Sequence, residues 1–340
     1  MCRRVALPLF ALSLAVSSCH STKALLPNVS GKAGEVIVVI EKDNWEGDLG
    51  TAVRDLLGGD CPYLMQREPL YNLVNIAPGG FAEILRVHRN ILMFNIDPSV
   101  TEPAVQYRSD VWAHPQRVIV VSAKDATEAL GLFGENSEKI LSSLEQAERD
   151  RIIANSILYE EVSFRDKVVD LAGGSPHFPT GYKWKTGNDD FIWIADEKQY
   201  VNQGIFIYRY PAKSTENFTE ENIIENRNRI LQENVPGMFE NTYMTTQTEV
   251  APPTVEFIRF RGRQFAQTRG FWEVKGDFMG GPFVSHSFYS KDNQYIIVVE
   301  GWVYAPRYDK RQYLRQVEAI VYSFEWDDKA TEAVTEEKKK

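Results

Sequence analysis

The sequence predicts an α+β fold organised as two lobes, and three observations support this. In the first half, dense apolar runs of strand length at residues 36–40 and 118–121 alternate with helical patterns. In the second half, strand signals come in runs and helices fall between groups of strands. Glycines and prolines at residues 173–179 separate the halves. We therefore expect a helix-rich mixed α/β lobe over residues 35–172 and an antiparallel, strand-rich lobe with packed helices over residues 180–326.

The first lobe is expected to contain alternating strands and helices. Its apolar strand candidates are residues 36–40, 71–76, 90–96 and 117–122. Apolar residues at helical spacing predict a helix over residues 49–57, which two glycines end, and a helical turn over residues 80–86. Asp125 is placed to cap a short helix, and a long helical pattern follows over residues 137–171. This order is compatible with a partly parallel sheet.

The second lobe is expected to be mostly antiparallel. Its strand candidates are residues 182–185, 191–195, 205–210, 254–261, 264–274, 283–290 and 294–304. An Asn-Asp pair at 188–189 supplies a hairpin turn, and the last four strands follow one another as a meander. Thr219 is expected to cap a helix that ends at Pro236. Asp309 together with Gln312 is expected to cap the last helix.

The N-terminus has the three zones of an export signal. Arg3 and Arg4 provide a positive start, and residues 5–16 form an apolar stretch. That stretch is too short for a permanent membrane span, which needs about 20 residues. Val16-Ser17-Ser18-Cys19 then has the order of a lipobox, so we expect residues 1–18 to be removed and Cys19 to carry lipid. The alternatives are an ordinary secretory signal with a chance cysteine and an uncleaved anchor.

The two ends of the mature chain are expected to lie outside the lobes. Residues 19–34 are interpreted as the lipidated cysteine and a short tether that is rich in Ser and Gly. Acyl chains on Cys19 make membrane lipid the first expected partner, since each buried methylene is worth about 0.8 kcal/mol. At the other end, residues 327–340 are highly charged and predict a solvated, disordered tail.

Composition limits the classes of partner and chemistry. The chain has 38 Lys and Arg against 47 Asp and Glu, a net charge of −9, whereas nucleic-acid binding depends on clustered basic side chains. We therefore expect no nucleic-acid partner. If Cys2 leaves with the signal and Cys19 is lipidated, Cys61 is the one remaining thiol, which excludes an intrachain disulfide and a cysteine-rich zinc site. A buried, inert thiol is favoured over a catalytic role for Cys61, and no cofactor is predicted.

The sequence contains no familiar catalytic motif. HExxH, GxSxG, SxxK, Walker, GxGxxG and calcium-loop patterns are all absent from it. Its five histidines are scattered singly, at positions 20, 88, 114, 177 and 286. A metal site assembled from His88, His114 or His286 stays open, but single, unrelated histidines are favoured and no metal site is predicted. A binding protein is therefore favoured over an enzyme.

The glycine-rich segment 276–282 gives the sharpest local hypothesis. It reads Gly-Asp-Phe-Met-Gly-Gly-Pro between two strand candidates, and Gly280 and Gly281 would let a ligand or partner backbone approach. Adjacent strands would bring further side chains alongside, so a site here would include Arg269, Trp272, His286 and Trp302. The alternative, a plain wide hairpin turn, has the greater weight.

Aromatic residues are dense in the second lobe, and exposed rings can stack on sugar faces. They are Trp184, Trp193, Tyr208, Tyr210, Trp272, Trp302, Tyr304 and Tyr308. Glycan binding is therefore one interpretation, and a core of strand-forming aromatics is the other.

Four segments taken together resemble a known family. They are the lipobox pattern, the Glu35-to-Ile40 strand, Gly280-Gly281-Pro282-Phe283 and Gly301-Trp302-Val303-Tyr304-Ala305-Pro306. The chain is similar in these to uncharacterised lipoproteins of the Bacteroidetes, known as domain of unknown function 4837, over nearly its whole length. The resemblance implies no activity. It does imply a cellular location. Residues 20–23 lack the acidic side chains that mark surface lipoproteins of that phylum, so the resemblance favours the inner leaflet of the outer membrane, facing the periplasm.

These expectations lead to a lipid-anchored, periplasm-facing envelope protein. An accessory protein that binds another envelope protein is favoured, and a glycan or ligand binder and an enzyme with an unrecognised site are the alternatives. An exposed apolar patch would favour the first, an open aromatic cleft the second, and a deep pocket with convergent His, Asp or Glu the third.

Overall fold

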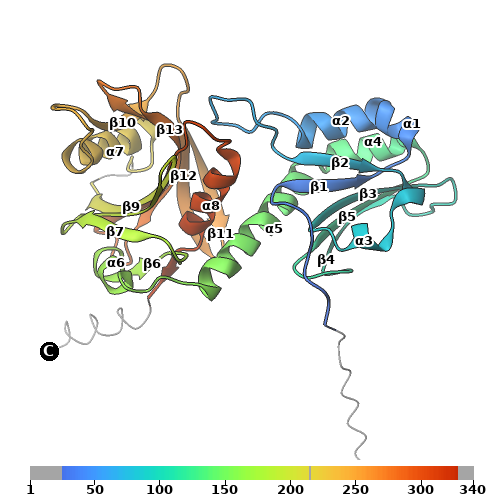
Figure 1. Cartoon of the computed structure of the whole chain (residues 1–340), viewed down its shortest axis with the longest axis horizontal. Helices are drawn as coiled ribbons and strands as arrows, with labels where there is room; N and C mark the ends of the chain where they lie inside the picture. Colours follow the sequence, from blue (N-terminus) through green and yellow to red (C-terminus); the bar gives the residue numbers. More distant parts are fainter. Residues whose placement is uncertain (1–24, 214–215, 328–340) are drawn as a thin grey trace, which may run out of the picture.

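The computed structural model describes residues 25–213 and 216–327. The predicted signal peptide, Cys19 and all but the first residue of the predicted tail lie outside these residues. The described chain has an α+β fold with two lobes, as the sequence predicts, and the long helix α5 (Ser137–Leu158) joins them (Figure 1).

The first lobe is built on a five-stranded, largely parallel sheet. Its strands lie in the order β2 (Asn72–Ile76), β1 (Glu35–Val39), β3 (Asn90–Ile96), β5 (Arg117–Ala123) and β4 (Ala104–Ser109). The neighbours β2, β1, β3 and β5 pair in parallel, and β4 pairs antiparallel with β5. Strand β4 was not predicted from the sequence, because this edge strand has no buried residue and no dense apolar run.

Both faces of the first sheet are covered. On one face α2 (Asp48–Leu57), α4 (Ala126–Glu135) and the first half of α5 pack on the strands, with α1 (Lys42–Glu46) just before α2. On the other face, the segment from η1 (Pro78–Gly80) to α3 (Glu83–Arg86) places Phe81 edge-on against Trp112. The Asp125 carboxylate accepts a hydrogen bond from the backbone N–H of Glu128, which confirms the predicted cap of α4.

The second lobe is built on an eight-stranded antiparallel sheet. Its order is β10 (Tyr243–Gln247), β12 (Arg263–Lys275), β13 (Gly280–Tyr289), β14 (Tyr295–Tyr304), β9 (Val201–Pro211), β8 (Phe191–Lys198) and β7 (Lys183–Gly187), with β11 (Thr254–Phe260) also paired to β12. The predicted meander of the last four strands is confirmed. Helix α7 (Glu220–Asn234) covers one face, and α6 (Arg165–Ala172) and α8 (Arg311–Tyr322) cover the other. A short ribbon of β6 (Gly174–Ser175) and β15 (Glu325–Trp326) lies beside them.

The helical pattern over residues 137–171 is two helices rather than one. Helix α5 ends at Leu158, and the chain then turns, with the N–H of Glu161 donating to the carbonyl of Phe178. Helix α6 begins seven residues after α5 ends, and its Val168 and Leu171 belong to the core of the second lobe. The division between the lobes therefore falls before α6, earlier than the glycines and prolines at residues 173–179.

The predicted tether is partly bound to the body. The carbonyls of Pro27 and Ala33 accept hydrogen bonds from the N–H of His114 and the Gln312 amide, and the N–H of Ser30 donates to Val87. Residues 27–34 are thus part of the fold, which begins before Glu35.

A side chain of the first lobe caps helix α8 of the second lobe. Asp309 and Gln312 do not cap α8 as predicted, because the Gln312 amide donates to Ala33. Instead the buried Glu68 carboxylate accepts hydrogen bonds from the N–H groups of Lys310 and Arg311 at 2.7 and 2.8 Å. A carboxylate at a helix N-terminus also interacts favourably with the helix dipole. This contact fixes one lobe against the other.

Candidate functional site

The side chains predicted around the glycine-rich segment lie on opposite faces of the second sheet. Alternation along β12 and β13 turns Arg269 and His286 toward α8, where Arg269 pairs with Glu318 at 2.8 Å. Trp272 and Trp302 lie on the α7 face, with ring centres 5.4 Å apart. The structure therefore brings the residues together in two pairs, and the sheet separates the pairs.

Three of these four side chains are also buried. Trp272, His286 and Trp302 are 1%, 0% and 4% exposed, and the indole N–H of Trp272 donates to the carbonyl of Val303. At Gly281 an added Cβ would lie 2.0 Å from the Val303 carbonyl oxygen, so this glycine accommodates a neighbouring strand. At Gly280 the nearest atom would be the carbonyl oxygen of Trp272, at 2.8 Å. The glycines serve close strand packing at these two positions.

The environment of His286 is structural. Its ring stacks on Phe265 with centres 3.7 Å apart and meets the edge of Tyr322. Burial, together with the nearby Arg263 and Arg269 cations, holds the pKa of His286 well below its ordinary value. The imidazole is therefore a neutral part of the core.

The remaining candidates from the sequence do not converge either. Burial raises the pKa of the Cys61 thiol to about 11, so the thiol stays protonated at neutral pH. His88 lies 3.5 Å from Glu35, His114 lies 2.9 Å from Asp110, and His177 contacts Glu160 in the second lobe. Among the described residues, no three His, Cys, Asp or Glu side chains are grouped to hold a metal ion.

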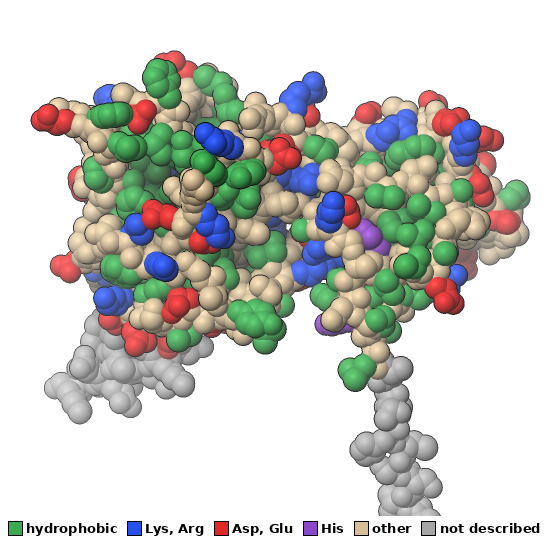
Figure 2. Space-filling model, in the orientation of Figure 1, with side chains coloured by type: hydrophobic (Ala, Val, Ile, Leu, Met, Phe, Trp, Pro, Cys, Tyr) green, Lys and Arg blue, Asp and Glu red, His purple; other side chains and the backbone are tan. Residues whose placement is uncertain are grey.

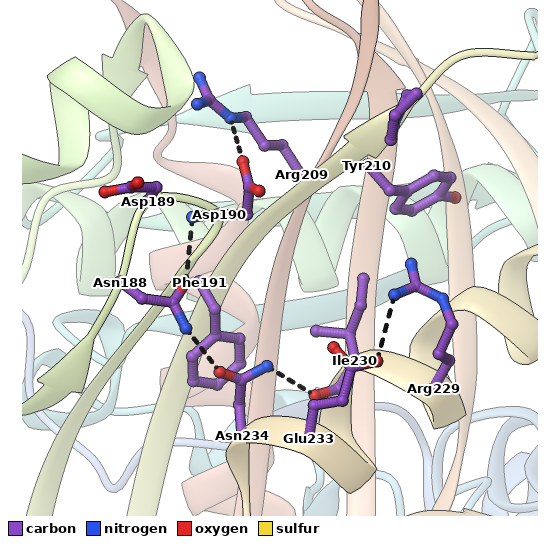
Figure 3. Close-up of a pocket in the computed structure, with 11 residues that line it drawn as sticks. Asn188, Asp189, Asp190, Phe191, Arg209, Tyr210, Arg229, Ile230, Glu233 and Asn234 are labelled. Carbon is purple, nitrogen blue, oxygen red and sulfur yellow. Dashed lines mark hydrogen bonds and ion pairs between the residues drawn. The ribbon is translucent and has the colours of Figure 1, made fainter.

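A hollow of about 590 Å³ lies between α7 and the adjoining ends of β8 and β9. We call it the α7 groove. It is lined by Asn188, Asp189, Asp190, Phe191, Arg209, Tyr210, Pro211, Arg229, Ile230, Glu233 and Asn234 (Figure 3). The hairpin turn, which was predicted at residues 188–189, forms one wall, and the last turns of α7 form the other.

Amide side chains fix the two walls to each other. The Asn188 amide donates to the Asn234 side-chain oxygen at 2.8 Å, and Asn234 donates to the carbonyl of Ile230 at 2.9 Å (Figure 3). The Asn188 side-chain oxygen also accepts a hydrogen bond from the N–H of Asp190. One hydrogen bond, from Asn188 to Asn234, therefore joins the turn to the helix end, and the other two order each wall internally.

The groove has charged walls above an aromatic floor. Arg209 pairs with Asp190 at 2.8 Å, and Arg229 pairs with Glu233 at 3.5 Å. Phe191 and Tyr210 are 1% and 4% exposed, so they support the groove without presenting a ring face. The Tyr210 hydroxyl is buried without a hydrogen-bond partner among the described residues, and burial raises its pKa.

The groove continues toward the N-terminus of α7. A second hollow of about 690 Å³ shares Tyr210, Pro211 and Arg229 with it and reaches Thr219, whose side chain caps the helix as predicted. Together the two hollows are lined by six acidic and three basic side chains, an excess of three negative charges. This surface offers hydrogen bonds and ionic contacts to a polar, cationic ligand.

The sequence analysis used the groove residues only as structural signals. It assigned Asn188 and Asp189 to a turn and Thr219 to a cap, and both assignments hold. One signal was missed: α7 contains asparagine at positions 222, 226, 228 and 234, although asparagine is a poor helix former. Asn222, Asn226 and Asn234 line the two hollows, whereas Asn228 accepts hydrogen bonds from Thr246 of β10.

Two domain families match the chain, each over one lobe. Residues 162–323 match a domain of unknown function, DUF4837, and residues 29–156 match another, DUF8532. The chain is thus similar to two families of unknown function, one over each lobe. The resemblance to DUF4837 is thus confirmed for the second lobe, whereas the first lobe matches a separate family. Their boundary, between residues 156 and 162, agrees with the end of α5.

Other comparisons add little. No curated protein matches the sequence. A solved structure from Bacteroides thetaiotaomicron VPI-5482 is similar at 7% identity, with a TM-score of 0.26. The match covers 47% of this chain and 48% of that one, so it spans about half of the length of each. A similarity this low carries no argument about fold or function.

Proposed function

We propose that this protein is a lipid-anchored accessory protein of the bacterial envelope, facing the periplasm from the outer membrane, and that it binds a partner protein through the α7 groove. The anchor rests on the sequence around Cys19. No helix in the described part of the chain has the length and apolar character needed to cross a membrane.

The observation that carries the binding role is the character of the groove. It is open, its walls are joined by the Asn188–Asn234 hydrogen bond, and it is lined by amides and by an excess of acidic side chains. Pockets for small molecules are mostly apolar and enclosed, which this groove is not. A basic, polar segment of another envelope protein fits its chemistry.

The structure lends less support to glycan binding. Stacking on a sugar needs an exposed ring face, and the aromatic residues at the groove, Phe191 and Tyr210, are buried. Trp272 and Trp302 are also buried. A partner protein therefore remains the favoured ligand.

The anchor is tested by metabolic labelling with a palmitate analogue. We expect label in the wild-type protein and none in Cys19→Ala, because the thiol carries the lipid. Protease added to intact cells should spare the body. A normally processed, membrane-bound protein without label would contradict the anchor, and digestion from outside would contradict the orientation.

The groove is tested by photocrosslinking in living cells. Benzoylphenylalanine at position 233 faces the groove, and the same residue at position 232 is its matched control, because Gln232 is exposed on α7 but does not line the groove. We expect a discrete crosslinked protein with a basic binding segment from position 233 only. Equal crosslinking from both positions would contradict a groove-specific partner.

A further inference from the structure

Apolar side chains are exposed at two places on one edge of the molecule. Leu25 is fully exposed at the start of the described chain, and Leu26 follows it. At the C-terminal end of α5, Leu158, Tyr159 and Val162 are 58–70% exposed, and Ile157 is 47% exposed. We call Leu25, Leu26, Ile157, Leu158, Tyr159 and Val162 the anchor edge. Four of these side chains are gathered within six residues at one helix end, and gathered exposed apolar groups mark an interaction surface.

Two sets of hydrogen bonds place both segments beside the same part of the first lobe. Arg151 of α5 donates to the carbonyls of Pro115 and Arg89. The N-terminal segment pairs with the adjacent His114 through Pro27. Beyond Arg151, α5 continues for two more turns to Leu158. In the N-terminal segment, Leu25 lies two residues before Pro27. Both reach the lower edge of the molecule, where apolar side chains project (Figures 1 and 2).

Polar side chains within the α5 end are held locally. Glu160 turns inward to His177 at 2.9 Å and to Arg165 at 3.2 Å. The Glu161 carboxylate accepts a hydrogen bond from the N–H of Ser163. The mixture of aliphatic side chains with Tyr159 is typical of residues at a membrane interface.

The position of Cys19 in the sequence places the anchor edge close to the membrane. Only residues 20–24 lie between Cys19, the lipid attachment site, and Leu25, the first described residue. The six steps from Cys19 to Leu25 span at most about 20 Å when fully extended. An acylated Cys19 therefore keeps the anchor edge within a short distance of the bilayer.

We propose that the anchor edge contacts the surface of the membrane in which the Cys19 acyl chains are inserted. The proposal rests on the lipid anchor proposed above and adds an orientation to it. Leu158 and Val162 enter the interfacial region, and Tyr159 lies among the headgroups. Helix α7 lies on the far side of the second lobe from this edge (Figure 1), so the α7 groove stays open to a partner.

The test uses the full-length, lipidated protein in vesicles of phosphatidylethanolamine and phosphatidylglycerol. In a Cys61→Ser background, an environment-sensitive NBD fluorophore is attached at Leu158→Cys. The matched control is Phe278→Cys, because Phe278 is fully exposed in the turn between β12 and β13 and is not part of the anchor edge. We expect vesicles to raise the fluorescence severalfold at position 158, shift it to shorter wavelength and protect it from dithionite, with no change at position 278.

Three outcomes would overturn the proposal. Equal quenching at positions 158 and 278, with acyl chains found on Cys19 by mass spectrometry, would refute the orientation and leave the anchor intact. Protection of position 158 without vesicles, increasing with protein concentration, would identify a second copy of the chain as the occupant. Absence of acyl chains from Cys19 would refute the anchor itself.

Discussion

The two lobes bury very different strands. In the first lobe, the central strands are nearly continuous apolar runs, and Val36, Val38 and Ile119 are completely buried. In the second lobe, the central strands also bury charged groups. Glu300 of β14 and Arg227 of α7 are both 0% exposed and pair at 2.7 Å under α7.

The comparison shows that polar residues in strands of the second lobe can be structural. Arg269 and His286 were assigned to a possible site because they lie on the strands that flank the glycine-rich segment. In the structure, Arg269 is paired to Glu318 and His286 is packed in the core. These polar residues of the second lobe connect the sheet to the helices that pack on it. The α7 groove lies instead at the adjoining ends of β8 and β9.

The largest expected effect is at the buried pair under α7. Glu300→Ala leaves the Arg227 guanidinium without its partner, so we expect a loss of about 3–5 kcal/mol in the free energy of unfolding. The matched control is Asp190→Ala, which breaks the more exposed pair with Arg209 and should cost roughly 0–1 kcal/mol. Urea unfolding followed by tryptophan fluorescence measures both. Equal effects would show that burial does not distinguish the two pairs.

The second prediction concerns acid stability at the junction of the lobes. Burial alone would raise the pKa of Glu318, but Arg269 and Arg149 lower it from 4.5 to about 2. The carboxylate therefore stabilises the fold fully above about pH 4.5, and this contribution, of about 3 kcal/mol, is lost as the pH falls toward 2. Glu318→Gln should lower the melting temperature at neutral pH and flatten its dependence on pH in that window. An unchanged pH profile would contradict this assignment.

A third, smaller effect tests the role of Gly281. Gly281→Ala places a methyl group against the Val303 carbonyl, so we expect a loss of about 1–3 kcal/mol from overpacking. Gly131→Ala is the control, because no atom lies within 4 Å of its added Cβ in α4, and it should be neutral or stabilising by up to about 1 kcal/mol. A stable Gly281→Ala variant would reopen the loop as a ligand site.

The smallest expected effect concerns the contact between the lobes and should leave both lobes folded. Glu68→Ala removes the cap that the first lobe gives to α8 and should cost about 1 kcal/mol. Hydrogen exchange should become faster in the first turn of α8, while the strands of both lobes keep their protection. Uniform exchange throughout the chain would show that the cap supports the whole fold rather than the junction.

Prediction from the sequence succeeded where the signal is local. Dense apolar runs identified β1, β3 and β5, and Asp125 and Thr219 cap the helices they precede. It missed β4 and β10, of which β4 is an edge strand with no buried residue, and it did not anticipate that Glu68 caps a helix over 240 residues away. The α7 groove was missed because its walls come from segments near positions 189, 210 and 230, which only the fold brings together.

The most direct experiment measures crosslinking at position 233 in cells and the melting temperature of the purified protein. The variant Glu221→Lys with Glu225→Lys reverses two exposed charges of the second hollow, and Glu300→Gln serves as its buried counterpart. We expect the Glu221→Lys, Glu225→Lys variant to lose the crosslink at an unchanged melting temperature, whereas Glu300→Gln should lower the melting temperature. A crosslink that survives the charge reversal would contradict the claim that the groove is the functional surface.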